Sequence, residues 1–91
     1  MKVSIIIPCY NEQSTIKEII NKINSQSNID KEIIVIDDYS NDKTREILET
    51  DLKNSISKII LNERNYGKGY SIKKGIENAS GDCIIIQDAD L

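Results

Sequence analysis

The segment EIIVIDDYSNDKT, at residues 32–44, contains the pattern that decides the fold. It begins with a run of aliphatic and β-branched residues that ends in the pair Asp37 and Asp38, and it continues with turn-forming residues. A short apolar run of this composition predicts a buried strand, and the polar residues predict a turn that leads into a helix. That helix is expected to face inward with Ile47 and Leu48.

The same succession of apolar run, polar loop and helix recurs in the rest of the chain. Three further apolar runs predict strands at residues 3–7, 59–61 and 83–87. Two further helices are expected, the first over residues 14–26 with Ser14 as its N-cap and the other over residues 71–78. Helical spacing predicts that their inner sides carry Ile16, Ile19, Ile20 and Ile23 in the first and Ile72, Ile76 and Ala79 in the other.

Four strands that alternate with three helices give the order βαβαβαβ. This order predicts an α/β fold with a mostly parallel, open, Rossmann-like sheet, and we expect residues 1–91 to form one domain or part of one. Right-handed crossovers place every loop that follows a strand at the carboxyl edge of such a sheet, where ligands bind. The first of these loops lacks glycine, so the pyrophosphate site of a nicotinamide dinucleotide-binding domain is not expected.

The composition argues against several classes of function. The 91 residues carry a formal net charge of -3 without a basic stripe, so we expect no nucleic-acid partner. The sequence contains no histidine, which removes histidine metal ligands and histidine-assisted nucleophilic catalysis. The apolar runs are too short to span a membrane and no signal peptide is evident, so a cytoplasmic location is expected. Cys9 and Cys83 fall at opposite ends of their strands, about 20 Å apart, and free thiols are expected.

Asp88 and Asp90 follow the last apolar run and are the candidate metal ligands. Their i, i+2 spacing on an extended backbone sends both side chains to one side, with Cα atoms about 6.6 Å apart. Two such carboxylates are suited to sharing Mg²⁺ or Mn²⁺, whose remaining positions are filled by water and phosphate oxygens. The alternative is a solvated strand end that binds nothing.

Asp37 and Asp38 end the strand of the opening segment. Adjacent residues on a strand point to opposite faces, so one carboxylate is expected to line the cleft and the other to brace the loop. The carboxylate in the cleft is a candidate acceptor for a ribose hydroxyl or a base N–H. The alternative is that both only cap the helix that follows.

Two other loops contain candidate ligand-binding residues. Pro8 fixes the chain as it leaves the first strand, Tyr10 offers a ring for stacking on a base, and Glu12 offers a hydrogen-bond acceptor. In the loop NYGKG, Lys68 lies between two glycines and offers a positive charge to a phosphate. The alternatives are a partly buried loop anchor at Tyr10 and a helix-entry turn with a solvated lysine at Lys68.

Taken in order, four segments resemble the family 2 glycosyltransferases of the GT-A fold: VSIIIPCYNE, EIIVIDDYSNDKT, NERNYGKGYSIKKGIENASGD and IIIQDADL. The last two look most like the polyprenyl- or dolichyl-phosphate hexosyltransferases. The resemblance implies a UDP- or GDP-sugar donor, a divalent cation and a lipid-phosphate acceptor. It also implies a nucleoside pocket lined by Pro8, Tyr10, Glu12 and Asp38, with Asp37 supporting it. By the same resemblance, Lys68 lies beside the donor cleft. Asp88 and Asp90 are the D-x-D pair that meets the ribose, the cation and the diphosphate.

Two residues depart from the pattern of the family. Tyr39 replaces a common glycine and Ser71 a common alanine. Because a tyrosine does not easily take a positive φ, we expect the loop after Asp38 to differ in shape.

Members of the family complete the fold with further strands, and some add membrane helices. The resemblance therefore implies that this chain is the amino-terminal part of a glycosyltransferase domain, cut after the D-x-D pair and inactive alone, in the cytoplasm or at the inner face of a membrane. The alternative is a non-catalytic module that binds a nucleotide or a partner. A phospho-acceptor signalling domain is disfavoured, because its acidic pair would follow the first strand. An uncovered last strand predicts self-association through the sheet edge.

Overall fold

The computed structural model describes residues 1–90, so Leu91, the last residue of the expected domain, lies outside the described part. The elements follow one another as β1 (Val3–Cys9), α1 (Ile16–Asn24), β2 (Lys31–Asp37), α2 (Thr44–Glu49), the 3-10 helix η1 (Lys53–Ser55), β3 (Lys58–Leu61), α3 (Lys68–Glu77) and β4 (Cys83–Ile86). The four strands form one sheet in the order β3-β2-β1-β4, and every neighbouring pair is parallel. The predicted α/β fold with an open parallel sheet is thus confirmed.

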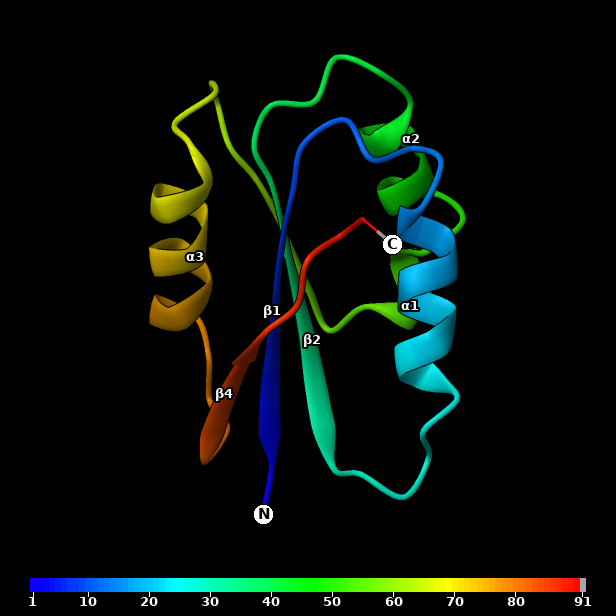
Figure 1. The fold of residues 1–91 in the computed structure, drawn as a ribbon, viewed down its shortest axis with the longest axis vertical. Coiled ribbons are helices and arrows are strands. Elements are labelled where there is room, and N and C mark those ends of the chain that lie inside the picture. The colour runs from blue at the N-terminus through cyan, green and yellow to red at the C-terminus, as the bar shows by residue number, and fades with distance from the viewer. Residues whose placement is uncertain (91) are drawn as a thin grey trace.

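The sheet lies between two layers of helices (Figure 1), with α1 and α2 on one face and α3 on the other. Successive strand residues point to opposite faces of the sheet, so the same strands supply apolar side chains to a core on each face. On one face, Ile7 and Val35 pack in a cluster that includes residues of α1 and α2. On the other face, Ile6, Ile34 and Ile36 form a smaller cluster. Strands that are apolar on both faces are typical of a parallel sheet covered by helices.

The strand order creates a switch point at β1. The chain proceeds from β1 to β2 to β3 in one direction and then returns to add β4 on the other side of β1. The loop after β1 leads to α1 on one face of the sheet, whereas the chain reaches β4 through α3 on the other face. A crevice at the carboxyl ends of such a pair of strands is the usual ligand site of an open α/β sheet.

The structure corrects two predictions about helices. The first helix begins at Ile16, not at a Ser14 cap, because the carbonyl oxygen of Glu12 accepts the backbone N–H groups of Thr15 and Ile16. The third helix begins at Lys68, three residues earlier than expected.

The inner face of α3 was predicted only in part, since Ala79 packs against the smaller cluster as expected. The buried residues of α3 are Ser71 and Gly75, whereas Ile76 is 44% exposed. At Gly75 an added Cβ would lie 2.5 Å from Cγ2 of Ile6 and 2.7 Å from Cδ1 of Ile36. The absence of a side chain therefore lets α3 approach the sheet closely, which a search for large apolar residues does not detect.

The amino ends of the strands are held together by the buried carboxylate of Glu32. It accepts hydrogen bonds from the hydroxyl of Ser4 and from the backbone N–H of Ser80, both at 2.6 Å, and Lys2 lies 3.6 Å away. These groups, the Ser4 hydroxyl first, lower the pKa of Glu32 from 4.5 to about 2. The carboxylate thus connects β1, β2 and the loop before β4 at the edge opposite the crevice.

The last strand is exposed in the described part of the chain. Ile84, Ile85 and Ile86 are each between 42% and 50% exposed. Self-association through this edge stays a prediction. Both cysteines are free thiols, as expected, with Cys9 buried and Cys83 exposed. Among residues 1–90, no helix combines the length and apolarity that crossing a membrane requires.

Gly75→Ala should lower the free energy of unfolding by about 1–3 kcal/mol, measured by urea denaturation. The new methyl group would overpack the contact between α3 and the sheet, which outweighs the gain of about 1 kcal/mol that alanine has over glycine within a helix. Gly69→Ala is the matched control, because a Cβ there meets nothing within 4 Å. Equal stability of the two variants would contradict the close packing of α3.

The charge of Glu32 should stabilise the fold above about pH 4.5 by about 3 kcal/mol. Its folded-state pKa is lowered, so the stabilisation is present above the unfolded pKa and is lost as the pH falls from 4.5 to about 2. Urea unfolding of the wild type and Glu32→Gln over this range should show the two curves converging toward low pH. Glu49→Gln, which changes an exposed carboxyl, is the control. The difference between its free energy of unfolding and that of the wild type should stay constant over this pH range.

Candidate functional site

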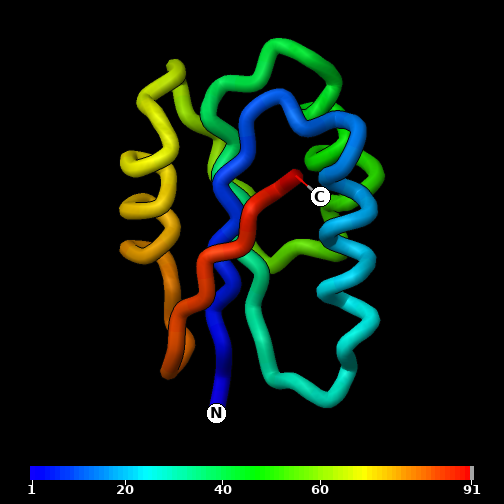
Figure 2. Tube along the Cα trace, in the orientation of Figure 1, coloured from blue at the N-terminus to red at the C-terminus, as the bar shows by residue number. Residues whose placement is uncertain are grey.

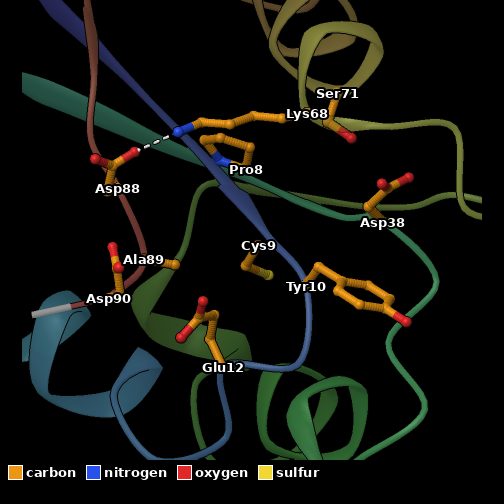
Figure 3. A pocket seen from close by; sticks show the side chains of 10 residues that line it. All are labelled: Pro8, Cys9, Tyr10, Glu12, Asp38, Lys68, Ser71, Asp88, Ala89 and Asp90. Atoms are coloured by element: carbon orange, nitrogen blue, oxygen red, sulfur yellow. Dashed lines mark hydrogen bonds and ion pairs between the residues drawn. The ribbon is translucent and has the colours of Figure 1, made fainter.

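A cavity of about 240 Å³ lies at the carboxyl edge of the sheet (Figure 3). Its walls come from the end of β1 and the loop after it, the loop after β2, the first turn of α3 and the segment after β4. It is lined by Pro8, Cys9, Tyr10, Glu12, Asp38, Lys68, Ser71, Asp88, Ala89 and Asp90. All the candidate residues expected from the sequence line it except Asp37, so the structure brings them together from four separate parts of the chain.

Hydrogen bonds connect the loop after β1 to the segment after β2, with backbone N–H groups of the first donating to side-chain hydroxyls of the second. The N–H of Asn11 donates to Oγ of Ser40 at 2.8 Å, and the N–H of Glu12 donates to Oγ1 of Thr44 at 2.9 Å. Between these loops the ring of Tyr10 is 44% exposed, and Figure 3 shows it beside the cavity. The ring is thus available for stacking and is not a core anchor.

Asp37 is fully buried and braces the turn that follows it. Its carboxylate accepts the N–H of Ser40 at 3.0 Å and pairs with Nε of Arg45 at 2.5 Å. The same guanidinium lies 5.2 Å from the ring centroid of Tyr39. Tyr39 has a φ of 68°, so it adopts the left-handed conformation that we expected a tyrosine to avoid. The contact between its ring and Arg45 helps to offset the strain of that conformation, which is of order 1 kcal/mol.

Asp38 lies at the cavity and at the same time holds the next loop in place. Its carboxylate accepts the backbone N–H groups of Tyr66 at 2.8 Å and Gly67 at 2.9 Å, together with Nδ2 of Asn62 at 3.0 Å. Asn62 also donates to Oγ of Ser71. The chain turns at Gly67 with a φ of 100° and then enters α3. Asp38 therefore fixes the turn from which Lys68 projects.

The end of the cavity beside β4 carries two exposed carboxylates, Asp88 and Asp90. Nζ of Lys68 lies 2.8 Å from Oδ1 of Asp88, and this hydrogen bond, with the charge of the carboxylate, raises the pKa of the lysine. Within residues 1–90 no three potential ligands from histidine, cysteine, aspartate and glutamate gather as a metal cage. Two carboxylates with an open side nonetheless fit Mg²⁺ or Mn²⁺, which complete their coordination with water and phosphate oxygens.

Cys9 lines the cavity but is not suited to act as a nucleophile. Burial, and secondly the neighbouring carboxylate of Asp37, raise the pKa of its thiol far above the physiological range. The group therefore stays protonated.

Sequence reasoning missed three residues that organise the site: Asn62, Thr15 and Arg45. Asn62 ends an apolar run just as Asp37 and Asp38 do, which is a signal that the sequence contains. Thr15 donates from Oγ1 to the carbonyl oxygen of Ala89 at 2.7 Å, and Arg45 pairs with Asp37. Nothing in the local sequence indicates these last two contacts, because each joins residues from different elements.

The chain matches a known protein family. Residues 4–91 match the family model described as glycosyl transferase family 2. An undecaprenyl-phosphate 4-deoxy-4-formamido-L-arabinose transferase from Salmonella paratyphi B is 41% identical over 96 residues, which is 99% of this chain and 29% of that protein. The chain thus spans less than a third of the length of such curated relatives.

Solved structures show the same arrangement of the chain. S. aureus TarS in complex with UDP superposes with a TM-score of 0.88 at 30% identity, over 99% of this chain and 28% of that one. The mannosyltransferase PcManGT from Pyrobaculum calidifontis, in complex with GDP-Man and Mn²⁺, gives a TM-score of 0.86 at 26% identity, over 97% and 27%. A glucosyl-3-phosphoglycerate synthase from Mycobacterium tuberculosis, in complex with Mn²⁺ and UDP, gives 0.80 at 28% identity, over 99% and 34%.

Asp38→Asn should loosen the loop before α3. The amide offers one acceptor oxygen in place of two and presents an NH₂ group to the backbone donors, so we expect the free energy of unfolding to fall by about 1–3 kcal/mol. Hydrogen exchange at the amides of Tyr66 and Gly67 should become at least about tenfold faster. Glu63→Gln, at an exposed carboxyl of the same loop, is the control and should leave both amides protected. Unchanged exchange in Asp38→Asn would contradict the role of the Asp38 carboxylate in holding this loop.

Proposed function

The chain belongs to glycosyl transferase family 2, and from that premise we propose that the cavity binds the nucleoside diphosphate part of a UDP- or GDP-sugar together with Mg²⁺ or Mn²⁺. The observation that carries the proposal is the convergence of Asp38, Lys68, Asp88 and Asp90 on one cavity at the carboxyl edge of a parallel sheet. Structural neighbours determined with UDP, or with GDP-Man and Mn²⁺, support it.

The charge of the cavity supports a requirement for a cation. Its lining includes four carboxyl groups, those of Glu12, Asp38, Asp88 and Asp90, and one ammonium group, that of Lys68. A diphosphate would be repelled by such a surface unless a cation lay between them. A cation held by Asp88 and Asp90 would supply this charge and would stabilise the diphosphate as it leaves the sugar.

The remaining residues suit the nucleoside. Tyr10 offers an exposed ring to a base, and Asp38 offers an acceptor to a base N–H or a ribose hydroxyl. Lys68 would turn from Asp88 toward a phosphate oxygen once a cation neutralises that aspartate. In this assignment Asp37 makes no contact with the ligand and acts through the turn that it braces.

We propose glycosyl transfer to a polyprenyl phosphate as the reaction of the whole protein. The curated relatives named for undecaprenyl phosphate support this acceptor. Their named sugar is an arabinose, which is a pentose, so the proposal covers a glycosyl group in general and is wider than the hexose expected from the sequence. The alternative is a module that binds the nucleotide without transfer. Turnover of a sugar nucleotide and polyprenyl phosphate by the 91-residue chain would exclude that alternative.

Calorimetry should detect binding of UDP or GDP that Mn²⁺ strengthens at least about tenfold relative to buffer with EDTA. Asp88→Asn and Asp90→Asn should each abolish most of this strengthening, because each removes a charged oxygen ligand while preserving the shape of the side chain.

The matched control is Asp30→Asn, at an exposed aspartate near the opposite edge of the sheet. It should bind nucleotide and Mn²⁺ as the wild type does. A folded wild-type chain that binds neither UDP nor GDP in the presence of Mn²⁺ would refute the proposal.

A further inference from the structure

After β4 the chain crosses the carboxyl end of β1 and reaches the start of α1 (Figure 2). The crossing begins where the N–H of Gln87 donates to the carbonyl oxygen of Ile6 at 2.9 Å. Asp88, Ala89 and Asp90 follow without belonging to a strand. Their backbone is therefore not held by the sheet, and the direction of the two carboxylates depends on other contacts.

Ala89 provides those contacts. Its side chain is only 4% exposed and packs in the core cluster that also contains Ile7 and Ile16. Its carbonyl oxygen accepts a hydrogen bond from Oγ1 of Thr15 at 2.7 Å. The residue between the two aspartates is thus anchored both by its methyl group and by its carbonyl.

Thr15 is itself held rigidly. Its N–H donates to the carbonyl oxygen of Glu12 at 3.1 Å, and its own carbonyl oxygen accepts the N–H of Ile19 at 3.0 Å as α1 begins. Oε2 of Glu12 lies 3.2 Å from the threonine hydroxyl, farther than the carbonyl of Ala89. Since a hydroxyl has one proton, the shorter contact with Ala89 is the one that receives it.

We propose that Thr15 is a positioning residue for the pair Asp88 and Asp90, and that its hydroxyl sets their orientation toward a divalent cation. The inference rests on the proposed function. With Ala89 held inward, the aspartates on either side line the cavity, as Figure 3 shows. Loss of the hydrogen bond frees the peptide that joins Ala89 to Asp90, so the two carboxylates lose their common orientation. Hydrogen bonds around metal ligands have this role in many sites, and their removal commonly weakens metal binding by about 10–100-fold.

Thr15→Val and Thr15→Ser separate the hydroxyl from the packing of the side chain. Calorimetric titration of UDP, or of GDP if that is the nucleotide bound, is performed with Mn²⁺ and with EDTA. In Thr15→Val, the factor by which Mn²⁺ strengthens nucleotide binding should fall about tenfold. The nucleotide affinity in EDTA should stay within about twofold of the wild type. Thr15→Ser keeps the hydroxyl and should restore the strengthening. If Thr15→Val does not fold, Thr15→Ala removes the same hydroxyl with less crowding.

Backbone NMR relaxation gives a second readout that needs no ligand. Thr15→Val should lower the order parameters of the amides of Ala89 and Asp90, while those of the sheet stay unchanged. Thr50→Val is the control, because Thr50 makes an equivalent hydroxyl-to-carbonyl bond of 2.7 Å to Glu46 at the end of α2. It should alter neither readout.

The outcomes separate the inference from the proposed function. A wild-type chain that binds no nucleotide with Mn²⁺ refutes the proposed function. A wild type that binds, with a folded Thr15→Val that keeps the full effect of Mn²⁺, overturns the role of Thr15 alone. Loss of the effect in both Thr15→Val and Thr15→Ser would also overturn it, because the hydroxyl would then not be the group responsible.

Discussion

The parallel pairing of β1 with both of its neighbours is the constraint on which the rest of the structure depends. β1 pairs with β2 along its whole length and with β4 on its other side, and its alternating isoleucines supply both cores. Because the strands run in the same direction, every strand-to-helix loop leaves the sheet at one edge. Burial of aliphatic side chains thus determines where the polar loops gather, although none of those isoleucines lines the cavity.

The loops at that edge are then connected to one another by hydrogen bonds that join different elements. Asp37 holds the start of the loop after β2, Asp38 holds the turn before α3, and Thr15 holds the segment after β4. In residues 1–90 every buried side-chain nitrogen or oxygen has a hydrogen-bond partner. A network completed in this way restricts each loop to one arrangement, which is the condition for placing carboxylates around a ligand.

The sequence predicted the order of elements and the convergence of the loops, because both follow from local apolar runs and from the rules of parallel sheets. It did not predict that α3 packs on the sheet through Gly75, since the role of this glycine is recognised only once the neighbouring Ile6 and Ile36 are in place. Nor did it predict that Tyr39 adopts a positive φ, because the guanidinium that lies against its ring comes from Arg45 in the next helix. The missed features are contacts between elements, for which a local pattern contains no signal.

The hydrogen bonds also distinguish two kinds of carboxylate at the cavity, which the sequence motifs alone do not. A carboxylate can accept about four hydrogen bonds, and Asp38 already receives three from Asn62, Tyr66 and Gly67. One acceptor position therefore remains for a group in the cavity, which limits a direct contact to one N–H or hydroxyl. Asp88 and Asp90, by contrast, are exposed, and the carboxylate of Asp88 is paired only with the exposed side chain of Lys68. The carboxylates at the end of β2 and just after it thus define the shape of the cavity, and those after β4 retain the open oxygens that a cation requires.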